Sequence, residues 1–148
     1  MASINKVVNI IYPEFYQTQY IYAYYKFNDE LKAMIEESGY KNEFIKKYRK
    51  SLRFLENLKQ NCIYQRKLFE KLTECKDLYS IMLFGKKNIR ILFTFMDVKT
   101  RKNAILLYSF EEKDDNNNSN YGYTKAMEIA NARIKEIKDY LVVNKEGK

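Results

Sequence analysis

Four side chains in the second half of the chain are of types that can cleave RNA without a metal ion: Arg90, Tyr108, Lys113 and Tyr123. In such a reaction the ribose 2′-OH attacks the adjacent phosphate, a Tyr or Lys handles the protons, and an arginine stabilises the added negative charge. Lys113 follows an apolar stretch that ends near residue 110, and the two tyrosines bracket the polar segment around it. These four residues are the candidate catalytic set.

Arg90 is the most informative member, because it interrupts the apolar run 89–93. A period of two places Arg90 and Leu92 on one face of a strand. An arginine in so apolar a strand needs an anion or a carboxylate as a partner. One interpretation is a bidentate phosphate clamp. The other is a structural ion pair, for example with Asp77 or Glu128.

Positive charge is concentrated in one part of the chain. The net charge of the whole sequence is +8, and residues 41–90 contain 14 Lys and Arg against 5 acidic residues, a local charge of +9. Such a patch attracts polyanions, of which nucleic acid is the most common, although a solvated helix face is the alternative explanation. The candidate RNA-binding residues are Lys86, Lys87, Arg101, Lys102 and Arg133.

Several classes of protein are disfavoured by what the sequence lacks. It contains no histidine, its two cysteines have no zinc-ligand spacing, and no Walker motif or Ser/His/Asp set is present. We therefore expect no metal and no cofactor. No run approaches the ~20 apolar residues of a membrane span, and residues 1–25 do not resemble a signal peptide. These features predict a cytoplasmic protein with reduced thiols and no membrane partner.

The elements that must position these residues follow from hydrophobic periodicity. Strands are expected over Lys6–Ile11 and Gln17–Phe27, although a helix remains an alternative for the second. Asn28 or Asp29 is the expected N-cap of a helix that ends at Gly39.

A longer helix over Asn42–Gln60 completes a helical hairpin, and a short amphipathic piece over Lys67–Leu72 leads into a sheet. Three strands and a final helix follow, at about Asp77–Phe84, Asn88–Met96, Asn103–Phe110 and Tyr123–Val143. The expected fold is α+β, an N-terminal helical hairpin packed on a small antiparallel sheet with a C-terminal helix. We expect residues 1–143 to form one domain and residues 144–148 to form a disordered tail.

The order and spacing of these motifs resemble the RelE/ParE superfamily of toxins, and within it the HigB-like, phage-associated branch. The resemblance covers roughly residues 66–140. The matching residues are Leu78-Tyr79, Arg90-Ile91-Leu92-Phe93, Leu106-Leu107, Phe110, Lys113, and Glu128-Ile129 with Ala132.

This resemblance implies a RelE-like fold and a ribosome-dependent mRNA endonuclease that inhibits translation and is neutralised by a cognate antitoxin. Arg90 matches the strand arginine that holds the scissile phosphate. Lys113 matches the second lysine after the last strand, and Tyr123 matches a tyrosine that some RelE-like members carry. The implied partners are the antitoxin, mRNA and the ribosome.

Three positions depart from the family pattern: Met82 replaces an arginine, Tyr108 a histidine and Glu112 a lysine. Two alternatives therefore stay open. One is a ParE-like protein that inhibits a target such as DNA gyrase by docking. The other is a catalytically degenerate relative that binds RNA without cutting it.

Overall fold

A six-stranded sheet organises the chain. The computed structural model describes residues 6–98, 100–112 and 119–146. In spatial order the strands are β1 (Val7–Val8), β4 (Ile21–Tyr24), β8 (Arg101–Glu112), β7 (Asn88–Val98), β6 (Tyr79–Leu83) and β5 (Phe69–Lys71). A separate two-stranded hairpin is formed by β2 (Ile10–Ile11) and β3 (Tyr16–Gln17).

The predicted fold class is wrong in the composition of the sheet and in the order of elements. The sheet is mixed, because β4 pairs in parallel with β8 while the other neighbouring strands pair antiparallel. Strands β1–β4 precede the helices, so the chain does not begin with a helical hairpin laid on a small antiparallel sheet. The segments before residue 25 supply two strands to the main sheet and enlarge it.

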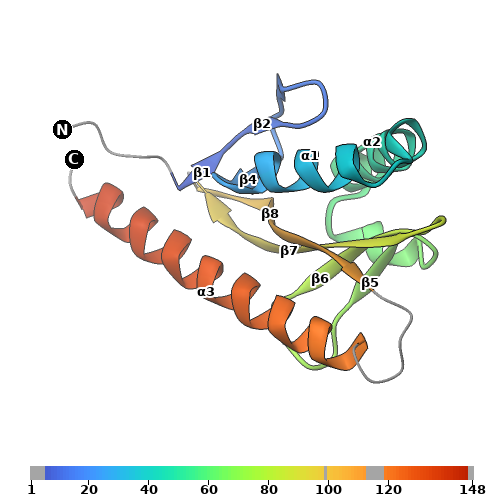
Figure 1. Cartoon of the computed structure of the whole chain (residues 1–148). Helices are drawn as coiled ribbons and strands as arrows, with labels where there is room; N and C mark the ends of the chain where they lie inside the picture. The colour runs from blue at the N-terminus through green and yellow to red at the C-terminus, as the bar shows by residue number, and fades with distance from the viewer. Residues whose placement is uncertain (1–5, 99, 113–118, 147–148) are drawn as a thin grey trace.

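Three α-helices cover the sheet: α1 (Phe27–Glu37), α2 (Lys41–Leu58) and α3 (Ser119–Glu146). A 3-10 helix over Lys59–Tyr64 continues from α2. Gly39 has a φ of +83°, a conformation that favours glycine, and it separates α1 from α2 as predicted. Figure 1 shows α1 and α2 together on one side of the sheet and α3 along the other.

The predicted N-cap of the first helix, Asn28 or Asp29, is wrong, because α1 already begins at Phe27 and the side chain of Asn28 binds elsewhere. The N-cap residue is Lys26, which makes no side-chain capping bond. Asn28 is buried, its Oδ1 accepts the backbone N–H of Tyr12 at 3.1 Å, and its Nδ2 donates to the Ile10 carbonyl at 2.6 Å. The side chain therefore ties the β2–β3 hairpin to α1.

The core lies between the sheet and the helices on both of its faces. The apolar stripe of α2 is buried at Phe44, Tyr48, Leu52 and Leu55. The apolar stripe of α3 is buried at Ala126, Ala130, Ile134 and Ile137. Within the described residues, no helix is long and apolar enough to cross a membrane.

The hairpin of β7 and β8 is the longest part of the sheet and determines where the polar side chains meet. It pairs Arg90 with Phe110 and Leu92 with Tyr108, and a bulge at Leu107 follows. The short amphipathic segment over Lys67–Leu72 contains β5, which is itself part of the sheet as an edge strand on β6. This edge strand adds a carboxylate to the face on which Arg90 lies.

Candidate functional site

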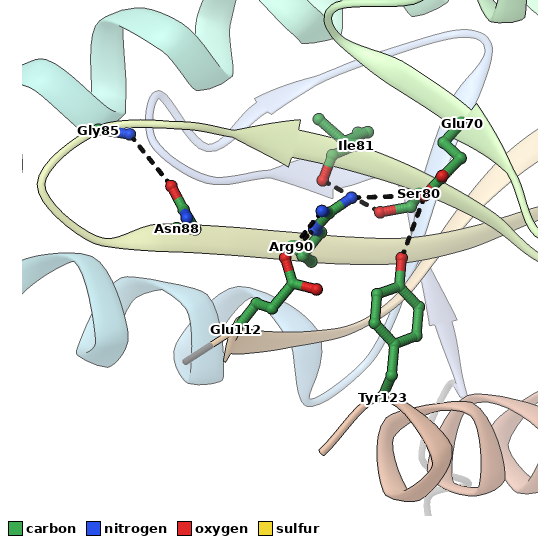
Figure 2. Close-up of polar contacts among 8 residues, drawn as sticks. All are labelled: Glu70, Ser80, Ile81, Gly85, Asn88, Arg90, Glu112 and Tyr123. Carbon is green, nitrogen blue, oxygen red and sulfur yellow. Dashed lines mark hydrogen bonds and ion pairs between the residues drawn. The ribbon is translucent and has the colours of Figure 1, made fainter. Parts of the chain in front are cut away.

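The side chain of Arg90 lies between two carboxylates. Its Nε donates to Glu112 Oε1 at 2.9 Å, and Nη2 lies 2.7 Å from the same oxygen. Its Nη1 lies 3.4 Å from Glu70 Oε1, a longer contact. Figure 2 shows these three residues together, with Tyr123 pointing from α3 toward Glu70. The ion-pair partners expected from the sequence, Asp77 and Glu128, are not the ones observed.

Two aromatic rings flank the guanidinium. Its Cζ lies 5.4 Å from the ring centroid of Phe84 and 5.6 Å from that of Tyr123, within the range of cation–π attraction. The Arg90 side chain is only 13% exposed, whereas Phe84, the residue after β6, is 44% exposed. The guanidinium is thus held in one orientation beside an exposed aromatic ring.

Tyr123 joins the site through its hydroxyl group, which donates to Glu70 Oε1 at 3.3 Å. Burial raises the pKa of Tyr123, and this effect outweighs the opposing influence of the Ser80 hydroxyl and the Arg90 charge. The phenol is therefore protonated at neutral pH. A neutral phenol hydrogen-bonded to a half-exposed carboxylate is a pair that can pass a proton to or from a ligand.

The sheet register explains why these groups meet. Glu70 of β5 pairs with Ser80 of β6, which in turn pairs with Leu92 of β7. Side chains in one such row share a face, and Arg90, two residues from Leu92, shares it as well. Glu70 of β5 thus reaches Arg90 of β7 although β6 lies between these two strands in the sheet.

Arg133 of α3 and Tyr108 of β8 belong to a second polar cluster. Both guanidinium Nη atoms of Arg133 lie 2.7 Å from the two carboxylate oxygens of Glu30 on α1, and Nη1 also donates to the Leu107 carbonyl at 2.8 Å. The rings of Tyr24 and Tyr108 lie 4.4 and 5.2 Å from Arg133 Cζ. The pairing of β4 with β8 ends at Leu106, and Arg133 thus supplies a hydrogen-bond donor to the carbonyl of the next residue, Leu107.

The remaining candidate RNA-binding residues lie at opposite ends of the β7–β8 hairpin. Lys86 and Lys87 occupy the turn between β6 and β7, near Arg90, and Lys86 is exposed. Arg101 and Lys102 are exposed at the start of β8, at the far end. Lys113 lies outside the described residues.

The structure thus brings together two of the four predicted catalytic residues, Arg90 and Tyr123. Among the described residues, Phe110 links Tyr108 to Tyr123, since its ring lies 6.5 Å from that of Tyr108 and 5.2 Å from that of Tyr123. Glu70 was missed by sequence reasoning, and no local signal in its short strand marks it. Among the described residues, no group of three or more Cys, Asp or Glu side chains is placed to hold a metal ion.

Three comparisons with known proteins found nothing similar to this chain. A scan of protein-family models, a search of curated proteins and a search of solved structures each returned no match.

Proposed function

We propose that the protein is a toxin-like, ribosome-dependent mRNA endonuclease that works without a metal ion and is neutralised by a small antitoxin. The observation that carries this proposal is the contact of Arg90, Glu70 and Tyr123 on one face of the sheet. It combines an anion-binding group, a carboxylate and a protonated phenol. The order of motifs, which resembles that of the HigB-like toxins, is the reason for proposing a toxin that acts on ribosome-bound mRNA.

In the proposed reaction the Glu70 carboxylate takes the proton of the ribose 2′-OH as that oxygen attacks the adjacent phosphorus. Arg90 stabilises the additional negative charge on the phosphate oxygens. The Tyr123 hydroxyl donates its proton to the departing 5′-oxygen, and Glu70 then returns a proton to Tyr123 along their hydrogen bond. The products are a 2′,3′-cyclic phosphate and a 5′-hydroxyl end.

RNA must compete with Glu112 for Arg90 in this scheme, because that carboxylate occupies two of the guanidinium N–H groups. The longer contact with Glu70 is the weaker of the two interactions. Lys86 and Lys87 on the adjoining turn favour the approach of a polyanion.

Cleavage of ribosome-bound mRNA by the purified protein tests the proposal. Tyr123→Phe removes one hydroxyl group and keeps the ring packed on Phe110, so we expect the cleavage rate to fall by about 10²- to 10⁴-fold while the fold is retained. Induction of the wild type is expected to arrest growth, and Arg90→Ala to relieve the arrest. Harmless expression together with intact ribosome-bound mRNA would exclude the enzyme.

A non-enzymatic binding protein is the second candidate, and the pairing of Arg90 with Glu112 favours it. The 2.7 Å contact between the Arg90 guanidinium and the Glu112 carboxylate is equally typical of a structural ion pair. Inhibition of DNA supercoiling by gyrase with translation unaffected would identify a ParE-like inhibitor. Salt-sensitive RNA binding without cleavage would identify a degenerate RNA-binding relative.

A further inference from the structure

An exposed aromatic ring borders the Arg90 site. Phe84 follows β6, and strand alternation places it on the same face as Met82 and Ser80, two and four residues earlier. Its contact with Arg90, the strand partner of Met82, agrees with this placement. Met82 and Ser80 are buried, whereas Phe84 is 44% exposed and lies outside the apolar core of the described residues. Burial of apolar surface therefore does not account for the position of this ring.

The Arg90 guanidinium covers only one side of the Phe84 ring. Its Cζ lies 5.4 Å from the centroid of that ring and 5.6 Å from the centroid of Tyr123, so the guanidinium lies against both rings. Within the described part of the chain, no second aromatic ring or cation packs on Phe84. The exposed surface of the Phe84 ring is therefore accessible to a ligand from solvent.

The backbone that carries this ring is held against α2. The carbonyl of Phe84 accepts a hydrogen bond from Lys47 Nζ, and the same ammonium lies 3.0 Å from Glu43 Oε1. Gly85 approaches α2 so closely that a Cβ on it would lie 3.1 Å from Glu43 Oε1. Its N–H donates to Asn88 Oδ1 at 3.5 Å, a long contact across the turn (Figure 2). The ring is thus positioned before a ligand binds, which lowers the conformational entropy lost on binding.

The charges around the ring indicate what kind of planar group it can bind. Exposed Lys86 lies two residues further along the turn and has no ion-pair partner among the described residues. Arg90 is the phosphate-binding group of the proposed function. A flat ring with such neighbours suits a ligand that carries both a planar group and a negative charge, and a nucleotide carries both. Aromatic side chains stack on the unpaired bases of single-stranded RNA, whereas bases inside a duplex are already stacked on one another.

We propose that Phe84 is the base-stacking residue of the Arg90 site and that its ligand is an unpaired nucleotide of single-stranded RNA. The base stacks on the exposed surface of the ring, while Arg90 and Lys86 bind phosphates of the same or the adjoining nucleotides. Purines bind more tightly than pyrimidines, because a larger base has a larger stacked area. This inference rests on the proposed function, since it takes RNA as the ligand, but it does not require that the RNA be cleaved.

Fluorescence anisotropy of the full chain with labelled oligoadenylate, oligouridylate and an abasic ribose-phosphate chain of equal length tests this inference. The three chains carry the same phosphates and differ only in their bases. We expect the wild type to bind oligoadenylate about tenfold tighter than the abasic chain, with oligouridylate between them. Phe84→Leu should weaken oligoadenylate binding about tenfold and leave binding of the abasic chain unaltered. Phe84→Trp keeps a stacking surface and should bind oligoadenylate at least as tightly as the wild type.

Phe15→Leu is the matched control, because it makes the same change at a residue that is 46% exposed in the turn between β2 and β3. Equal loss of oligoadenylate and abasic binding in Phe84→Leu would overturn the inference, because the ring then acts only by holding Arg90 in place. So would equal effects of Phe84→Leu and Phe15→Leu, or no binding of any of the three chains. A base-dependent effect of Phe84→Leu with ribosome-bound mRNA left intact would retain the inference and exclude the endonuclease. Cleavage of that mRNA without an effect of Phe84→Leu would do the reverse.

Discussion

Replacing Glu112 by glutamine separates the two interpretations of Arg90. If Arg90 binds RNA phosphate, Glu112 is a competitor, and its neutralisation must strengthen RNA binding. If Arg90 is only half of a structural ion pair, the same change must cost stability and leave RNA binding unaltered. Glutamine keeps the shape and one oxygen acceptor, so it changes little besides the charge.

The expected magnitude follows from the geometry of the pair. Two guanidinium N–H groups share the single oxygen Oε1 at 2.9 and 2.7 Å, and both side chains are less than one fifth exposed. Hydrogen bonds to charged groups contribute roughly 1.5–3 kcal/mol net, and two on one oxygen are not additive. About 1.5 kcal/mol of competition is therefore removed, which corresponds to about a tenfold lower Kd for RNA. We expect Tm to fall by about 3–6 °C, since Arg90 keeps a neutral acceptor at residue 112 and only one carboxylate partner, the more distant Glu70.

Fluorescence anisotropy of a labelled single-stranded RNA at one fixed ionic strength measures this change. Glu128→Gln is the matched control, because it makes the same charge change at an exposed position on α3. A gain no larger than that of Glu128→Gln would refute the reasoning. So would a gain that persists when Arg90→Gln is added, because the benefit then does not act through Arg90.

Three further outcomes are expected elsewhere in the molecule. Arg133→Met should lower the free energy of unfolding by about 2 kcal/mol, measured by urea denaturation, because it leaves a carboxylate without its bidentate partner. The hydrogen bond from Lys6 lowers the folded-state pKa of Glu136, so its contribution to stability is present above about pH 4.5 and is lost as the pH falls through the lowered value. Glu136→Gln should therefore flatten the dependence of Tm on pH in the acid range. Burial raises the pKa of the Cys62 thiol to about 12, so iodoacetamide should label Cys75 in the folded protein and Cys62 only after unfolding.

Local pattern was sufficient to place most elements of the chain. Helical spacing of apolar residues identified α2 and α3, and strand periodicity identified β6, β7 and β8, because each element buries one face of its own segment. The turn at Gly39 was also predictable, since its positive φ is available to glycine at little cost. The parallel pairing of β4 with β8 was not predictable, because hydrophobic periodicity does not specify which distant strand pairs with a given strand.

The candidate site was likewise predictable from the sequence in part. Sequence alone determined that Arg90 lies in an apolar strand and needs an anionic partner. It also placed Tyr123 in the helix that follows, although that helix begins at Ser119 and not at Tyr123 as predicted. Only the tertiary structure decided that Glu112 and Glu70 are the partners of Arg90. It also decided that Tyr123 donates a hydrogen bond to Glu70 and that Arg133 pairs with Glu30. The physical reason is that burial of a charge creates a requirement that many residues could satisfy, and only strand register and helix packing select the residues that do.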